Sequence, residues 1–284
     1  MATEALEAIL RMTAAGSLAV LLVLALRAPA RRWFGPEVSY RLWAWPPLAT
    51  LGVLLPAHMV GGAAGPLETP FRTLAQAAAN AGVLPWLGAS WLAGALVAAS
   101  YLAIVQTVFM RKARKGLGGP AVVGVINPRL ILPVDPRYGP AERTLIRAHE
   151  LEHIRRNDPR ANALAALTQV LFWFNPLTTI AGWALRLDQE LACDAAVMRG
   201  RPARQTYARA LLKAQMLDVV APLACPWPAA ATHPLLLRLR ELSRPPPSGP
   251  RQAIGELMIS AAWAGLSLTA WAATVIATLP RLYG

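Results

Sequence analysis

Four long apolar stretches limit what this 284-residue chain can fold into more than any other feature. About 20 apolar residues are needed for a helix to cross the hydrocarbon core of a bilayer. The stretches lie at residues 6–26, 40–60, 84–110 and 254–279. The chain is also 55% hydrophobic and only 15% charged, unlike an ordinary soluble domain. We therefore predict a mainly α, polytopic membrane protein with four transmembrane helices.

The basic residues predict how these helices cross the membrane. Arg27, Arg31 and Arg32 follow the first stretch, and the densest basic run, residues 111–115, follows the third. Basic clusters beside membrane helices favour the cytoplasmic side. We expect both termini outside and a multi-pass location in a bacterial cytoplasmic (inner) membrane. The net charge of +13 then reflects topology, and no direct nucleic acid binding is expected because no nucleic-acid motif accompanies it.

A cytoplasmic domain is predicted between the third and fourth membrane helices. Residues 121–126 and 129–132 are short aliphatic runs separated by Asn127-Pro128, a pattern typical of strand, turn and strand. A helix from Pro140 to about residue 157 follows. The predicted domains are three membrane helices in 1–110, a cytoplasmic domain in 111–250, and the fourth membrane helix with a short outer tail in 251–284.

A zinc-protease motif lies on this predicted helix, in the sequence His149-Glu150-Leu151-Glu152-His153. Residues four apart share one face of a helix, so the two histidines can place imidazole nitrogens on one zinc ion. Glu150 can take a proton from a water molecule that the metal has activated. We predict one catalytic zinc ion with Glu150 as the catalytic base, and a structural role for Glu152.

The third zinc ligand is predicted farther along the chain, at Glu190. Glu190 and Asp194 lie four apart in a helical stretch, so Glu190 can complete a set of three protein ligands while Asp194 hydrogen-bonds a ligand histidine. Glu152 and Asp158 lie nearer the motif and are the acidic residues most easily confused with ligands.

The apolar segment 161–187 lies between the motif and Glu190, and it constrains the topology. Asn175-Pro176 interrupts it. A single crossing of the bilayer would separate Glu190 from the two histidines, so the segment must return. It is either a re-entrant pair of helices or a pair of interfacial helices, and both place the site at the cytoplasmic surface.

These motifs together resemble the BlaR/MecR-type antirepressor membrane metallopeptidases. The resemblance rests on the His149-Glu150-x-x-His153 motif with the Ile154-to-Asp158 stretch after it, on Asn175-Pro176, on Glu190-x-x-Cys193-Asp194, and on the sequence from Asn127 to Pro133. It implies zinc ligation by His149, His153 and Glu190 in a gluzincin-like α+β domain, with Glu150 as the base and Asp194 in support. It also implies cleavage of a cytoplasmic protein, typically a transcriptional repressor, in signal transduction.

An extended substrate is expected to pair with the edge of the strand before the zinc helix. The substrate-binding candidates are Arg129, Leu130, Ile131 and Leu132. Well-known members of the family carry a penicillin-binding sensor domain after the fourth helix, which we expect this chain to lack. The cysteines, Cys193 and Cys225, are expected to be reduced, because two cysteines outside a C-x-x-C pair do not form a disulfide framework.

Two alternatives remain open at this point. The motif is also similar to that of HtpX/Ste-type quality-control endopeptidases, whose substrates are membrane proteins. A non-catalytic receptor or scaffold with a structural metal is the alternative of another class. Glu150 argues against the scaffold, since a structural zinc site needs no base and usually has four protein ligands.

Overall fold

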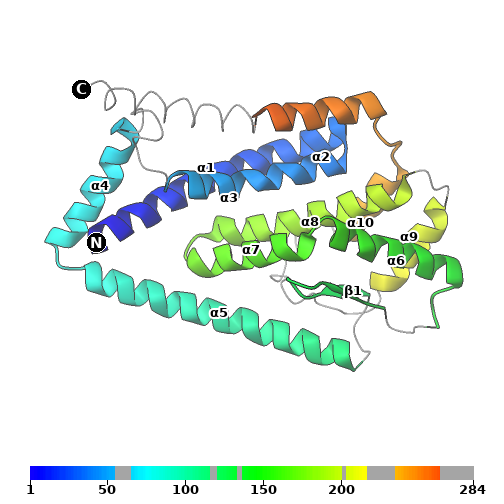
Figure 1. The fold of residues 1–284 in the computed structure, drawn as a ribbon, viewed down its shortest axis with the longest axis horizontal. Helices are drawn as coiled ribbons and strands as arrows, with labels where there is room; N and C mark the ends of the chain where they lie inside the picture. The colour runs from blue at the N-terminus through cyan, green and yellow to red at the C-terminus, as the bar shows by residue number, and fades with distance from the viewer. Residues whose placement is uncertain (55–64, 116–119, 133–135, 200–202, 216–233, 263–284) are drawn as a thin grey trace, which may run out of the picture.

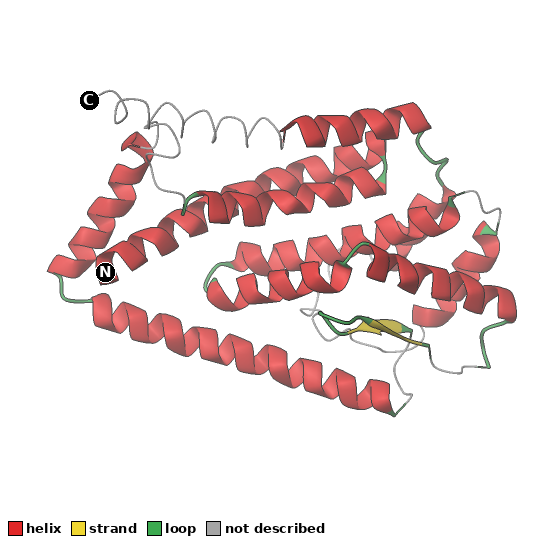
Figure 2. Cartoon of the chain, in the orientation of Figure 1, coloured by secondary structure: helices red, strands yellow, loops and turns green. Residues whose placement is uncertain are grey.

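A computed structural model shows a mainly helical chain, as predicted, with one small hairpin of strands (Figure 2). It describes residues 1–54, 65–115, 120–132, 136–199, 203–215 and 234–262. The helices are α1 (Ala2–Phe34), α2 (Pro36–Arg41), η1 (Leu42–Ala44), α3 (Trp45–Gly52), α4 (Gly65–Asn80), α5 (Leu84–Arg114), α6 (Pro140–Arg155), α7 (Asp158–Leu171), α8 (Pro176–Met198), α9 (Arg204–Gln215) and α10 (Pro234–Ser243). A further helix occupies residues 249–262.

Two of the described helices, α1 and α5, are long and apolar enough to cross a membrane. They contain the first and third predicted spans and extend beyond them, to Phe34 and Arg114. Large apolar side chains of α5 face outward, including Leu96 and Val97, which are 60% and 70% exposed. Such side chains are stable in contact with lipid, which supports α5 as a membrane helix.

The second predicted span is not one continuous helix. Residues 36–52 form α2, η1 and α3 in succession, and the last of these begins at Trp45 with Pro46 and Pro47 in its first turn. Proline lacks the amide hydrogen that an uninterrupted helix would need there, but it suits a first turn. Residues 55–64 and 263–284 lie outside the described residues, so the four-span topology stays a prediction.

The predicted strand, turn and strand form an antiparallel hairpin, although each strand is shorter than expected. β1 (Ala121–Val123) pairs with β2 (Arg129–Ile131), and Ala121 lies opposite Ile131. Gly124 allows the turn, because its φ is +98° and a Cβ atom there would lie 2.9 Å from the Asn127 carbonyl oxygen. The hairpin lies beside α6, which β1 contacts (Figure 1).

The apolar segment 161–187 returns on itself, as predicted, as the helices α7 and α8. The Asn175 side chain accepts a hydrogen bond of 3.0 Å from the Leu177 amide and so caps α8. The two helices approach closely at Gly182, where a Cβ atom would lie 2.1 Å from Nε2 of Gln169. Because α8 runs back beside α7, its C-terminal half lies against α6 (Figure 1).

Helix α8 belongs to both hydrophobic cores of the described chain. One core joins α6, α8, α9 and α10 through Leu145, Val197, Tyr207, Leu211, Leu235 and Leu242. The other joins α1 and η1 to α8 through Val23, Leu42, Trp43, Ala184 and Leu185. Each fully buried aliphatic side chain contributes about 1.5–3 kcal/mol relative to its exposed state. One continuous helix therefore connects the candidate membrane helix α1 with the domain that carries the His149–His153 motif.

Candidate metal centre

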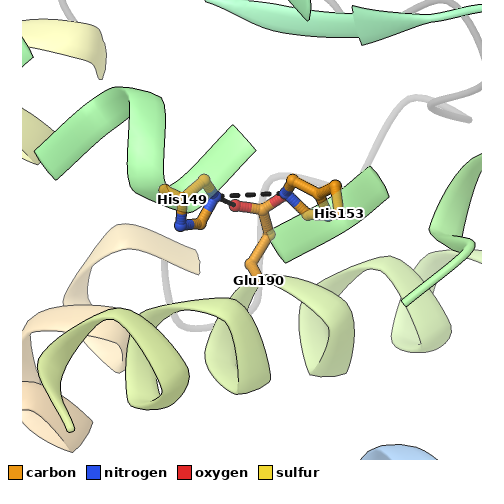
Figure 3. A group of neighbouring side chains, drawn as sticks. All are labelled: His149, His153 and Glu190. Atoms are coloured by element: carbon orange, nitrogen blue, oxygen red, sulfur yellow. Dashed lines mark hydrogen bonds and ion pairs between the residues drawn. The ribbon is translucent and has the colours of Figure 1, made fainter. Parts of the chain in front are cut away.

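Three of the predicted site residues meet between α6 and α8 (Figure 3). The Nε2 atoms of His149 and His153 lie 3.1 Å apart, one turn from each other on α6. Glu190 approaches from α8, with one carboxylate oxygen 3.3 Å from Nε2 of His149 and the other 3.4 Å from Nε2 of His153. All three donor atoms lie within 4.8 Å of one another. The structure thus brings together side chains that are 41 residues apart in the sequence.

The outer nitrogen of His153 is held by a carboxylate. Its Nδ1 lies 2.8 Å from Oδ2 of Asp158, a residue that is 1% exposed. A carboxylate accepts hydrogen bonds, so Nδ1 carries the proton and Nε2 keeps its lone pair. The other Asp158 oxygen accepts a 2.7 Å hydrogen bond from the Tyr40 hydroxyl. The nitrogen of His153 that faces Glu190 is therefore an acceptor, as a metal ligand must be.

His149 is oriented in the same way through a tyrosine. The Tyr207 hydroxyl lies 2.7 Å from Nδ1 of His149 and 2.6 Å from Oδ1 of Asp194. A hydroxyl has one proton, which it donates to the carboxylate, so it accepts the Nδ1 proton of His149. The Asp194 oxygen also lies 3.2 Å from that nitrogen. Asp194 thus lies against His149, the predicted ligand, and Tyr207 hydrogen-bonds both residues.

The donor set fits a catalytic zinc site. Two imidazole nitrogens and one carboxylate face a common point, and a cation bound between them would remove their mutual repulsion. Two histidines and one glutamate are a known ligand set of catalytic zinc, which keeps its fourth position for water. The outward hydrogen bonds of both rings are the arrangement that metal-bound histidines ordinarily show.

Arg238 of α10 binds two of the acidic residues of α8, Glu190 and Asp194. It forms two 2.7 Å hydrogen bonds with Asp194, and its Nη1 lies 2.9 Å from a Glu190 oxygen. Burial opposes the charged form of each carboxyl group, but the guanidinium outweighs it, lowering the pKa of Asp194 to about 2 and that of Glu190 well below its ordinary value. Both groups are therefore carboxylates at neutral pH. Sequence reasoning missed Arg238, because nothing distinguishes it among 28 basic residues.

Glu150 lies beside these donors and has no hydrogen-bond or ion-pair partner in the part of the chain that the structure describes. It is 9% exposed and forms no hydrogen bond or ion pair with any described residue. Burial raises its pKa, which makes its carboxylate a stronger base than an exposed one. By contrast, Glu152 points away from this centre and binds Arg155 at 2.7 Å, in agreement with its predicted structural role.

Asp158 and Cys193 occupy the outer side of His153. Sequence reasoning regarded Asp158 as a possible rival ligand, but its carboxylate binds Nδ1 and not the nitrogen that faces Glu190. The Cys193 sulfur lies 3.4 Å from the same Nδ1, and burial raises the pKa of this thiol to about 11. Cys193 is therefore a neutral thiol, free as expected, while Cys225 lies outside the described residues.

The predicted substrate strand is present, but no contact tests its role. Arg129, Leu130 and Ile131 lie in β2, and Leu132 follows it. One edge of β2 pairs with β1, and the opposite edge pairs with no other strand of the described chain.

The part of the chain that contains this centre resembles known proteins. Residues 112–242 match a family model described as BlaR1 peptidase M56. The chain is 35% identical over 81 residues to regulatory protein BlaR1 of Bacillus licheniformis, and 30% identical over 105 residues to the methicillin resistance mecR1 protein of Staphylococcus aureus. These stretches are 28% and 36% of this chain but only 14% and 18% of the two relatives. No solved structure matches the chain.

Proposed function

The chain belongs to the BlaR/MecR-type family of membrane metallopeptidases, and on that premise we propose that it is a zinc endopeptidase acting on a cytoplasmic protein. One observation carries the proposal. Both motif histidines turn an acceptor nitrogen toward the Glu190 carboxylate, while the buried Glu150 next to them has no partner among the described residues. A purely structural site would need no such unpartnered carboxylate.

His149, His153 and Glu190 are the residues that would hold the zinc ion. Bound there, the ion supplies Lewis acidity that polarises a peptide carbonyl and makes water more acidic. The chain's own contribution is to fix the donor atoms. Asp158 and the Tyr207–Asp194 pair set the imidazole tautomers, and Arg238 keeps the Glu190 carboxylate charged and in place.

Glu150 acts as the general base of the reaction. Its carboxylate accepts a proton from the attacking water and then donates it to the amine that leaves the cleaved peptide bond. Its burial removes competing water, and neither of its oxygens is engaged by another described residue. Proton transfer by a positioned group of this kind contributes roughly 10²- to 10⁴-fold to a rate.

The proposed topology places this centre on the cytoplasmic side, between the third and fourth of four membrane helices. Residues 1–110 would hold three spans, 111–250 the peptidase domain and 251–284 the fourth span. Support comes from α5, a candidate span that ends in the exposed basic residues Arg111 and Lys112. The aligned relatives are named as regulatory and resistance proteins, which favours a transcriptional repressor as the substrate.

Substrate recognition is proposed at β2. Its outer edge pairs with no other described strand, so an extended peptide could add to it through main-chain hydrogen bonds. Arg129, Leu130, Ile131 and Leu132 would then contact alternate side chains of the substrate.

Co-expression with repressors encoded beside the gene tests this function. We expect the wild type to produce a repressor fragment on an immunoblot, and Glu150→Gln to produce none. Glu152→Gln is the matched control, since it changes the other motif glutamate, which binds only the surface residue Arg155. Fragment formation by the Glu150→Gln variant would contradict the proposed chemistry. Cleavage of an unfolded protein such as casein, with the repressor left intact, would contradict the proposed substrate only.

A further inference from the structure

A strongly basic cavity of about 1110 Å³ lies beside the C-terminal end of α1. Its walls come from the end of α1, from α8, α9 and α10, and from the residues that lead into the helix 249–262. Seven arginines and three carboxylates line it. The cavity is separate from the converging donor atoms of His149, His153 and Glu190, none of which belongs to its lining.

Four of these arginines have no carboxylate partner among the described residues. Three others form ion pairs: Arg31 with Asp188 and Glu241, Arg199 with Glu37, and Arg244 with Glu241. Among the described residues, no ion pair involves Arg32, Arg204, Arg240 or Arg251. They come from four separate elements, namely α1, α9, α10 and the helix 249–262. Four guanidinium groups around one cavity repel one another, and a bound anion would relieve that repulsion.

The cavity lies where a membrane helix leaves the bilayer. The apolar part of α1 ends at Leu26, and Arg27, Arg31 and Arg32 follow it in the last turns of the helix. Trp33 also lines the cavity and is 64% exposed. Tryptophan is enriched at the level of lipid headgroups, and exposed arginines next to it lie within reach of lipid phosphates.

One wall of the cavity is formed by a stiff segment that packs tightly. Pro245, Pro246 and Pro247 belong to the lining, and Pro247 lies against Gly35 between α1 and α2. A Cβ atom on Gly35 would lie 2.9 Å from Cγ of Pro247, and the φ of Gly35 is +100°. Proline segments lose little entropy when they are fixed, so this wall is preorganised.

We propose that this cavity binds the phosphate headgroup of an anionic phospholipid, such as phosphatidylglycerol. Guanidinium groups bind phosphate oxygens through paired, charge-assisted hydrogen bonds. Free phosphate offers the same oxygens but no acyl chains to enter the bilayer beside α1. Because the cavity lies at the end of α1, a candidate membrane span, we assign it to a lipid and not to free phosphate. The proposal does not depend on peptidase activity.

Native mass spectrometry of the full chain from nanodiscs tests the assignment. The nanodiscs contain equal parts of phosphatidylglycerol and phosphatidylcholine, and retained lipid is counted on each protein. The pocket variant is Arg32→Gln/Arg240→Gln, and Arg111→Gln/Lys112→Gln removes the same charge from the exposed end of α5. We expect the wild type and the α5 variant to retain phosphatidylglycerol, and the pocket variant to retain about tenfold less.

Equal retention of phosphatidylglycerol by the pocket variant, or an equal loss in the α5 variant, would overturn the site. Retention of both lipids alike by the wild type would also overturn it. Millimolar inorganic phosphate, added in phosphatidylcholine nanodiscs, should leave no bound phosphate, and its retention would overturn the lipid assignment. Circular dichroism checks folding, and Arg204→Gln/Arg251→Gln repeats the test if the first variant misfolds.

Discussion

At the scale of single residues, the centre depends on what binds the outer nitrogen of each histidine. Asp158 accepts from Nδ1 of His153, and Tyr207 accepts from Nδ1 of His149, so both Nε2 atoms face Glu190 as acceptors. A change in these outer partners should therefore alter metal affinity without removing a ligand.

Asp158→Asn should weaken zinc binding by about 10- to 100-fold, because the asparagine amide no longer fixes the proton of His153 on Nδ1. Competition with a chelator of known affinity measures the change. Glu152→Gln serves as the control and should bind zinc as the wild type does. An Asp158→Asn protein with wild-type affinity would show that this hydrogen bond does not orient the ligand.

Site residues that lie close together in the sequence could be predicted, and those that the packing of α9 and α10 brings in could not. His149, Glu150 and His153 share one helix, so their spacing alone places them on one side of it. Glu190 and Asp194 were predicted because chemistry required an acid and few were available. Arg238 and the paired role of Tyr207 depend on how α9 and α10 pack against α8, which no local pattern encodes.

At the scale of secondary-structure elements, the N-terminus of α6 is held by one glutamate. Glu142 accepts a 2.9 Å hydrogen bond from the Gly139 amide, and both of its oxygens lie 2.7 Å from Nζ of Lys213 on α9. The Lys213 hydrogen bond, followed by that of the Gly139 amide, lowers the pKa of Glu142 below its ordinary value. The ion pair between Glu142 and Lys213 thereby connects α6 to α9.

This glutamate should make stability depend on pH. Because the pKa of Glu142 is lower in the folded chain, its contribution is complete above about pH 4.5 and is lost as the pH falls below that value. Glu142→Gln should cost about 1 kcal/mol at pH 7, typical of a lost helix cap, and less at pH 3. Thermal unfolding in detergent at both pH values measures this. An equal loss at the two values would contradict the role of the charge.

The close approach of α7 and α8 at Gly182 can also be tested. A Cβ atom there would lie 2.1 Å from Gln169, so Gly182→Val should force the helices apart and destabilise the chain by about 1–3 kcal/mol. Gly88→Val on α5 is the control, since a Cβ atom there meets nothing within 4 Å. Equal unfolding temperatures for the two variants would contradict the packing shown.

The helices were predicted best where a residue that favours a helix start, such as proline, marks the first turn. Asn175-Pro176 marks the start of α8, and Pro140 marks the start of α6. Hydropathy did not indicate that the helix restarts within the second apolar stretch, because it does not register Pro46 and Pro47. The length of β1 and β2 was overestimated, since aliphatic runs continue past the last paired residue.

At the scale of the whole molecule, α8 joins the candidate membrane helix α1 to the candidate metal centre. Asp188 lies two residues before Glu190 and is 1% exposed. Its carboxylate binds Arg27 and Arg31 of α1, each at 3.3 Å, and accepts a 2.7 Å hydrogen bond from the indole of Trp43. A displacement of α1 would therefore act on the same helix that carries Glu190.

Asp188→Asn should destabilise the chain more than a surface change does. Removal of one partner from a buried ion pair costs about 3–5 kcal/mol, because the remaining charges lose their counter-ion. The variant should unfold at a markedly lower temperature, while Glu241→Gln, which leaves Asp188 in place, should have a smaller effect. Unchanged unfolding of Asp188→Asn would show that α1 and α8 are not held together by this group.

The central claim is that the chain is a zinc peptidase with Glu150 as its base, and one measurement tests it most directly. Purified protein is stripped of metal with a chelator, reloaded with zinc, and assayed for zinc content and for cleavage of an unfolded protein in the same samples. We predict one zinc ion per chain in the wild type and in Glu150→Gln, with cleavage restored only in the wild type. Cleavage by zinc-loaded Glu150→Gln, or cleavage by the wild type without any metal, would contradict the account.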